Sequence, residues 1–263
     1  MKYDVNGVPL IIDYFVDGIT FSLFDDFNEL SDDVWSHETG NVRNNELQFY
    51  KKGNVSTKES CLVITAKRET ACNKSWTSGS VTGQHKQRLG YGKIEVRAKF
   101  PNVTGAFGAI WTLGANHWID YREDEQTANS SPTGSVPWPQ CGEIDITETI
   151  PGDAKTAKCN LWAYNGGSLG NYSSPAYDPE QFHVYFADIC PDRIDVGVDG
   201  VIYHSYRDAD LGADSMKAYK LPQYIIINLA VGASGGVPPA DCNEMVMLVD
   251  WVRYHSTNKP EIC

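Results

Sequence analysis

The segment from residue 93 to residue 100 shows the clearest alternation of charged and apolar residues in the chain. Its sequence is KIEVRAKF, so every second side chain is charged. Successive side chains of a β-strand point to opposite faces of the sheet, and this period of two therefore predicts a strand with one packed face.

The rest of the chain shows the same pattern of short strands and turns. Strands are predicted at residues 61–66, 107–113, 194–198, 201–206, 225–231 and 245–252. The dipeptides Asn6-Gly7, Asp17-Gly18 and Asp199-Gly200 are typical of tight turns, and the last predicts a β-hairpin. Asp178-Pro179 predicts the start of one brief helix. Because no helical period is sustained, we expect one antiparallel β-sandwich or barrel over residues 1–263.

Composition excludes several classes of protein. The chain has 22 Lys and Arg against 34 Asp and Glu, a net charge of −12, which argues against nucleic acid and disfavours polyanionic ligands. No run approaches the ~20 apolar residues of a membrane span, and the acidic N-terminal segment does not resemble a signal peptide. Seven cysteines without a C-x-x-C pair argue against zinc and leave buried thiols and disulfides both open.

The segment CGEIDITE, residues 141–148, places three acids close together. On a strand, Glu143 and Asp145 share one face, while Ile144 and Ile146 take the other. Glu148 lies five residues after Glu143, so it reaches the same face only if the strand contains a β-bulge.

Three interpretations of these acids are open: solvated strand residues, a metal site, or paired carboxyl groups for acid/base and nucleophilic chemistry. Like charges on one strand face cost stability, and a structural role would more naturally use Thr or Lys. The third interpretation is therefore favoured.

A resemblance to a known family supports it. The segment WPQCGEIDITE, residues 138–148, resembles the active-site signature of glycoside hydrolase family 16, and E-x-D-x-x-E resembles the bulged form of laminarinase-type β-1,3-glucanases and some galactan hydrolases. Further segments follow in the family's order, at residues 25–28, 45–50, 91–101, 182–183, 198–200, 228–232 and 249–253. The resemblance implies an all-β fold, a β-jelly-roll sandwich of two curved antiparallel sheets with a concave substrate cleft.

The resemblance also implies roles for the acids. Glu143 would be the nucleophile, Glu148 the general acid/base, and Asp145 would tune the charge between them. A retaining glycosidase needs two carboxyl groups roughly 5–5.5 Å apart. We expect a retaining endo-hydrolase of β-1,3-glucan or mixed β-1,3/1,4-glucan that requires no cofactor for catalysis. The alternatives are a β-galactan hydrolase, a transglycosylase acting through the same covalent intermediate, and a non-catalytic jelly-roll lectin. Lectin relatives typically lose one or both acids, which are present here.

Seven residues are candidates for glycan contact. Trp138 and Trp111 would stack on sugar rings, although Trp111 also suits a core. Trp162 stands where laminarinase-type members usually have a His near the substrate. Hydrogen bonds to sugar hydroxyls are expected from Arg97, Asn228, Asn45 and Glu46. For Arg97 a solvated strand face is the alternative, and for the last two an ordinary loop-to-strand junction.

The remaining expectations concern calcium, partners and location. Asp250 matches a position that supplies a structural calcium ligand in many members, and an Asp among apolar neighbours needs Ca²⁺ or Arg253 as a partner. The predicted partner is a neutral polysaccharide, without nucleic acid or membrane, and the predicted state is a monomer. A polymeric substrate predicts a secreted protein, while the many thiols leave the cytoplasm open.

Overall fold

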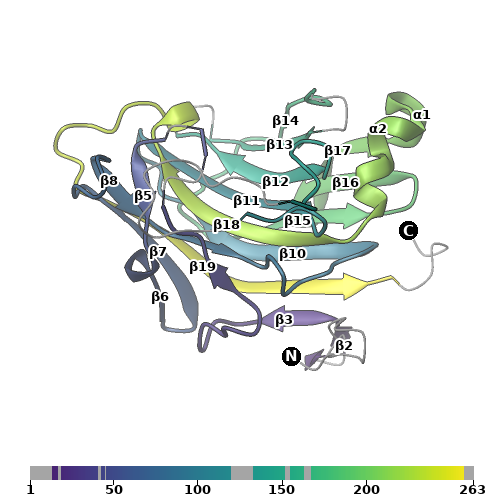
Figure 1. Ribbon diagram of the computed structural model, residues 1–263, viewed down its shortest axis with the longest axis horizontal. Helices are drawn as coiled ribbons and strands as arrows, with labels where there is room; N and C mark the ends of the chain where they lie inside the picture. The colour runs from purple at the N-terminus through teal and green to yellow at the C-terminus, as the bar shows by residue number, and fades with distance from the viewer. Residues whose placement is uncertain are drawn as a thin grey trace.

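A computed structural model describes residues 14–16, 19–40, 43–44, 46–119, 133–151, 155–162 and 167–257. Two large β-sheets pack face to face, and helices are few and short (Figure 1). The strands of the smaller sheet are bowed, with their hollow side turned away from the larger sheet (Figure 1). The predicted all-β jelly-roll sandwich is confirmed.

The larger sheet has ten strands among the described residues. All of its pairs are antiparallel except β5 with β8, which is parallel. Its order is β17 (Val201–Arg207), β16 (Arg193–Val198), β15 (His183–Ile189), β10 (Gly92–Lys99), β19 (Glu244–Ser256), β7 (Cys61–Lys67), β8 (Trp76–Ser78) and β5 (Gln48–Tyr50), with β3 (Leu23–Asp25) beside β19 and β6 (Val55–Lys58) beside β7.

The smaller sheet has seven strands among the described residues and carries the predicted site. Its pairs are antiparallel, and the strand with the three acids lies near the middle. Its order is β14 (Tyr172–Ser173), β13 (Ala157–Trp162), β12 (Glu143–Thr149), β11 (Ala106–Gly114), β18 (Gln223–Val231), β9 (Ser80–Thr82) and β4 (Ser36–His37).

The other elements are short. They are the hairpin of β1 (Tyr14–Val16) and β2 (Ile19–Phe21), the helices α1 (Asp208–Leu211) and α2 (Ala213–Met216), and the 3-10 helices η1 (Lys52–Asn54), η2 (Lys217–Lys220) and η3 (Ala233–Gly235). The helix predicted at Asp178 is wrong. The Asp178 carboxylate accepts a hydrogen bond from the backbone N–H of Glu180 at 3.1 Å and closes a turn that does not continue as a helix.

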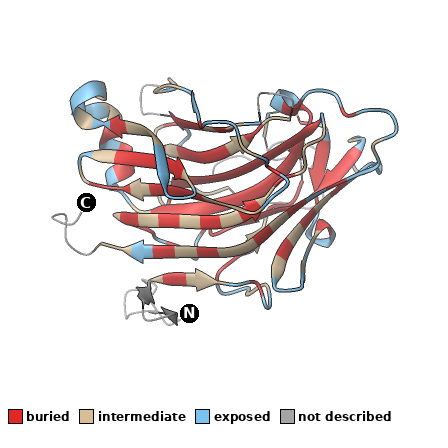
Figure 2. Cartoon of the chain, turned by 180° about the vertical axis from the view of Figure 1, so that it is seen from behind, coloured by how far each residue is buried: buried red, intermediate tan, exposed pale blue. Residues whose placement is uncertain are grey.

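The alternating segment forms β10 as predicted. Ile94, Val96 and Ala98 are completely buried, while the charged residues between them are half-buried. The same banding of buried and partly exposed residues runs along several strands in Figure 2. By contrast, β11 and β18 are buried along their whole length, so both of their faces are covered.

Two apolar clusters distinguish the faces of the seven-stranded sheet. Ile110 of β11 and Ile225 of β18 belong to the main core between the sheets. Trp111 and Ile226, the next residues on each strand, belong to a smaller cluster with Cys141. Because neighbouring side chains of a strand point in opposite directions, the smaller cluster lies on the concave face.

Two structural findings concern the cysteines and the possibility of a membrane-spanning helix. The six cysteines within the described ranges are all free thiols, with three of them buried. In the same part of the chain, no helix is long and apolar enough to cross a membrane.

Candidate active site

Strand β12 presents its acids on the concave face. Ile144 and Ile146 are completely buried in the main core between the sheets. Glu143 and Asp145 therefore point to the opposite face, beside the smaller apolar cluster.

A β-bulge brings Glu148 to the same face. Asp145 pairs with Trp111 of β11, and Glu148 pairs with Ala109, so three steps along β12 match two steps along β11. The pairing of β12 with β13 shifts in the same interval. One extra residue of β12 is accommodated there, and the predicted bulge is confirmed.

The turn before β12 needs a glycine. Gly142 has a φ of +81°, a conformation that L-residues rarely adopt, and its N–H donates to the Pro139 carbonyl at 2.9 Å. A Cβ atom at this position would lie 2.8 Å from the Cβ of Ala218. The glycine therefore lets the chain enter β12 close to its neighbour and fixes where Glu143 begins the strand.

Glu143 is half-buried, and several neighbours favour its charged form. Burial raises the pKa of its carboxyl group to about 7, and the negative charge of Glu148 acts in the same direction. The indole Nε1 of Trp138 donates to Oε2 at 2.8 Å, a hydrogen bond that lowers this pKa. The Arg43 charge and a hydrogen bond from Asp145 also lower it. The hydrogen bonds from Trp138 and Asp145 thus stabilise the carboxylate form of Glu143, the form a nucleophile needs.

The surroundings of Asp145 favour its protonated form. Its pKa is raised well above the ordinary value, first by burial and then by the negative charges of Glu143 and Glu148. Since the hydrogen bond to Glu143 raises the pKa of Asp145 and lowers that of Glu143, Asp145 is the donor. Asp145 therefore stabilises the ionised nucleophile.

Glu148 is suited to hold and release a proton near neutral pH. Burial raises the pKa of its carboxyl group to about 7, the Lys158 charge lowers it, and the Glu46 charge raises it. A general acid works best with a pKa near the working pH, because it must be protonated and still release the proton readily.

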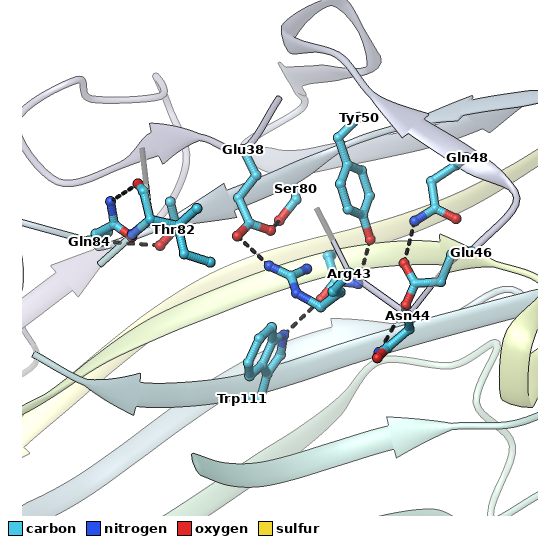
Figure 3. A network of polar contacts seen from close by, with 12 residues as sticks. Glu38, Arg43, Asn44, Glu46, Gln48, Tyr50, Ser80, Thr82, Gln84 and Trp111 are labelled. Atoms are coloured by element: carbon cyan, nitrogen blue, oxygen red, sulfur yellow. Dashed lines mark hydrogen bonds and ion pairs between the residues drawn. The ribbon is translucent and has the colours of Figure 1, made fainter. Parts of the chain in front are cut away.

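A polar network lies on the same face beside β12 (Figure 3). The Nε1 of Trp111 donates to Asn228 Oδ1 at 2.8 Å, and Asn228 Nδ2 donates to the Tyr50 hydroxyl at 3.0 Å. Glu46 is 3% exposed and accepts a hydrogen bond from Gln48 Nε2 at 2.5 Å. The structure therefore gathers three predicted contact residues, Trp111, Asn228 and Glu46, near the acids. Asn45 lies outside the described residues.

The two predicted stacking residues have different surroundings. Trp138 is 46% exposed, and its ring centre lies 5.4 Å from that of Trp162, at 52°. Trp111 is buried, and the Cζ of Arg43 lies 4.9 Å from its ring centre. Trp138 therefore offers aromatic surface beside the nucleophile, whereas Trp111 forms part of the floor under Arg43.

Arg97 does not lie at this site, and its prediction as a cleft residue is wrong. It belongs to β10 of the other sheet, opposite Trp251 of β19, and forms an ion pair with Asp250. Its Cζ also lies 4.5 Å from the ring centre of Phe182. The apolar face of β10 packs into the core, so its charged face points outward, on the far side of the molecule from the acids.

The partner of Asp250 is Arg97 and not Arg253, which binds Glu95 with an Nε–Oε2 distance of 2.7 Å. A guanidinium beside the Asp250 carboxylate would repel a cation, so these side chains do not fit a calcium ion. Within the described residues, no three His, Cys, Asp or Glu side chains group as metal ligands would. A structural calcium bound mainly by backbone carbonyls stays a prediction.

Sequence reasoning missed Arg43 and Glu38. Glu38 is completely buried, pairs with Arg43 and accepts a hydrogen bond from Ser80 Oγ at 2.5 Å (Figure 3). Arg43 directly precedes the polar run that was expected to contact glycan, and a cation at that place was a usable signal. No signal in the sequence pointed to Glu38, because it lies outside any motif.

Comparison with known proteins decides the family. The model of glycosyl hydrolases family 16 matches residues 43–253, most of the chain. The chain belongs to this family.

Individual relatives are similar over most of the chain. A beta-glucanase of Rhodothermus marinus is 29% identical over 252 residues, covering 88% of this chain and 82% of that protein. A laminarinase of Flavobacterium sp. UMI-01 has a solved structure with a TM-score of 0.77 and 30% identity, covering 90% of this chain and 100% of that one. A keratan-sulfate endo-1,4-beta-galactosidase of Sphingobacterium multivorum is 28% identical, but the match covers 69% of this chain and 40% of that protein.

Proposed function

We propose that this family 16 protein is a retaining endo-β-glucanase that hydrolyses β-1,3-glucan or mixed β-1,3/1,4-glucan. The observation that carries the proposal is the set of three carboxyl groups that one bulged strand places on the concave face. Glu143 accepts hydrogen bonds from Trp138 and Asp145, and Glu148 keeps a proton up to about pH 7.

The reaction would proceed in two displacements. In the first, the Glu143 carboxylate attacks the anomeric carbon while Glu148 gives its proton to the glycosidic oxygen, so the leaving chain departs as an alcohol and a glycosyl ester forms on Glu143. In the second, ionised Glu148 takes a proton from water, the water oxygen attacks the anomeric carbon, and Glu143 leaves as a carboxylate. Two inversions give net retention. Attack by a sugar hydroxyl in place of water would give transglycosylation.

Asp145 supports both steps without touching the substrate. Its hydrogen bond stabilises the charge on Glu143 before attack and again when the ester breaks. Burial and the neighbouring Glu143 and Glu148 charges raise the pKa of Asp145, which favours its protonated form and limits the negative charge at the site.

Glucan is favoured over galactan by the extent of the likeness. The beta-glucanase match covers 88% of this chain, and the laminarinase structure covers 90%, whereas the galactosidase match covers 69%. The acidic net charge also fits a neutral polymer better than a sulfated one. A non-catalytic lectin needs neither a nucleophile nor a general acid, so the retained carboxyl groups of Glu143 and Glu148 favour an enzyme.

The test is substrate release by matched variants. Purified protein is incubated with laminarin, lichenan, barley glucan, agarose, porphyran and carrageenan, and reducing ends are measured. Glu143→Gln and Glu148→Gln should each lower the rate on glucan by about a thousandfold. Glu244→Gln removes an exposed acid at the start of β19 and should leave the rate unchanged. Activity on a galactan alone, or near-full activity of Glu143→Gln, would overturn the proposal.

We also propose that the protein acts outside the cell, because a glucan polymer does not cross the cell membrane, and that it acts as a monomer. Light scattering on the purified protein tests the second statement, since a mass of about twice the 29.2 kDa chain would contradict it.

A further inference from the structure

Arg43 lies on the concave face, one strand away from the acids. Its Cζ is 4.9 Å from the ring centre of Trp111, and Trp111 pairs with Asp145 of β12. Its charge also acts on Glu143, so the guanidinium lies within electrostatic reach of the reacting carboxyl group. No step of the proposed reaction uses it.

The ion pair with Glu38 gives this arginine a defined orientation. The Glu38 side chain is completely buried, whereas the Arg43 side chain keeps 20% of its surface exposed. Ser80 Oγ holds the Glu38 carboxylate from the other side at 2.5 Å. The buried carboxylate and the Trp111 ring therefore anchor the guanidinium (Figure 3). Because Trp111 belongs to the apolar cluster on the concave face, Arg43 lies on the face that carries the acids.

The chemistry of the group favours a neutral sugar. A guanidinium carries five N–H donors in a planar fork, which suits the oxygens of two neighbouring hydroxyl groups. Glu38 balances its charge, and the Glu46 and Glu143 carboxyl groups, on which the Arg43 charge acts, add negative charge nearby, so an anionic substituent would be repelled.

We propose that Arg43 determines specificity by donating hydrogen bonds to ring hydroxyls of a glucose unit in a subsite beside the catalytic strand. Trp162 lies on β13 and Trp111 on β11, the two neighbours of β12, so this subsite lies across the catalytic strand from Trp162. The inference rests on the proposed function, since it takes a neutral β-glucan as the ligand.

Arg97 provides a matched control on the other sheet. Like Arg43, it pairs with a carboxylate, that of Asp250, and it lies over an aromatic ring, that of Phe182 at 4.5 Å. Replacing either arginine by methionine removes one ion pair and one cation–π contact. Only Arg43 belongs to the concave face.

The experiment measures binding without turnover. In the Glu143→Gln background, the affinity for a β-1,3-linked glucose pentasaccharide is measured by calorimetry with and without Arg43→Met. The affinity should fall about 10- to 100-fold, the usual loss when a charged hydrogen-bond donor is removed. Arg97→Met in the same background should change it less than about twofold.

A second variant separates binding from folding. Arg43→Met leaves the buried Glu38 carboxylate without this arginine and could unfold the protein. Arg43→Met combined with Glu38→Gln removes both charges, so it should unfold at a temperature close to that of the parent and still bind the pentasaccharide at least tenfold more weakly.

The outcomes separate the two proposals. Affinity of the double variant equal to that of the Arg97→Met control would overturn the role of Arg43 and leave the glucanase proposal standing. Absence of pentasaccharide binding to the Glu143→Gln parent, together with no release of reducing ends from any glucan by the unmutated protein, would overturn the proposed function and this inference with it.

Discussion

At the scale of single residues, the site works because burial and hydrogen bonds act against each other. Burial alone would leave all three carboxyl groups protonated near neutral pH. Hydrogen bonds from Trp138 and Asp145 favour the carboxylate form of Glu143, whereas the Glu46 charge favours the protonated form of Glu148. One carboxyl group can then attack while another still holds its proton.

Replacing Trp138 by phenylalanine tests this selection. The variant loses the donor to Glu143 Oε2, so the pKa of Glu143 should rise and the acidic limb of the pH profile of kcat/KM should move to higher pH. We expect kcat/KM at pH 6 to fall about tenfold, the effect of one hydrogen bond to a charged group.

Trp162→Phe is the control for lost aromatic surface. Trp162 packs against Trp138, and its backbone carbonyl accepts the Tyr219 hydroxyl at 2.6 Å, a contact that phenylalanine keeps. The acidic limb of the kcat/KM profile of Trp162→Phe should lie at the same pH as that of the unmutated protein. An unmoved limb in Trp138→Phe would show that the indole does not set the ionisation of Glu143.

At the scale of elements, one bulge and one glycine decide where the carboxyl groups lie. The bulge returns Glu148 to the concave face, and the turn at Gly142 sets the entry of β12 next to Ala218. Both are backbone features, so the site depends on main-chain geometry as much as on the acids.

Alanine substitutions at two glycines separate conformational strain from crowding. Gly142 and Gly200 have similar φ values, +81° and +78°, but a Cβ at Gly200 would meet nothing within 4 Å. Gly200→Ala should therefore lower the free energy of unfolding by about 1 kcal/mol, the cost of the left-handed conformation. Gly142→Ala should lower it by about 2–4 kcal/mol, because crowding against Ala218 adds to that cost. Equal losses in urea unfolding would contradict this account of the turn.

The elements also show how far sequence reasoning could reach. The spacing of Glu143, Asp145 and Glu148 was enough to predict the bulge, because side-chain direction on a strand depends on counting alone. The alternation in β10 predicted a strand with two faces, but it could not tell that Arg97 faces away from the acids, since that depends on which sheet the strand joins. Glu38 and Arg43 both lie outside the strands, so no periodic pattern predicts their pairing.

At the scale of the whole molecule, the buried acids link stability to pH. The pKa values of Glu143, Asp145 and Glu148 are all raised in the folded state, so these three groups hold more protons in the folded protein than in the unfolded chain from about pH 4.5 to 7. Stability falls with rising pH wherever the folded state binds more protons. The two glutamates should therefore make the free energy of unfolding higher at pH 5 than at pH 8, by roughly 1–3 kcal/mol each, against a smaller opposite contribution from His37, His117 and His204, whose pKa values burial lowers.

Glu148→Gln should reduce this dependence. The variant removes one of the raised pKa values, so urea unfolding should show it to be more stable than the unmutated protein at pH 8 and about equally stable at pH 5. Glu244→Gln, which removes an exposed acid, should leave the difference between the two pH values unchanged. If Glu148→Gln lost stability equally at both pH values, that result would contradict a raised pKa of Glu148 in the folded protein.

The most direct test of the central claim is the anomeric configuration of the first product. Proton NMR can follow laminarin hydrolysis from the first minutes, before the new reducing end equilibrates. Double displacement through Glu143 predicts that the β-anomer signal appears first and the α-anomer signal grows later by mutarotation. First appearance of the α-anomer would contradict a covalent intermediate on Glu143 and, with it, the roles given to the three acids of β12.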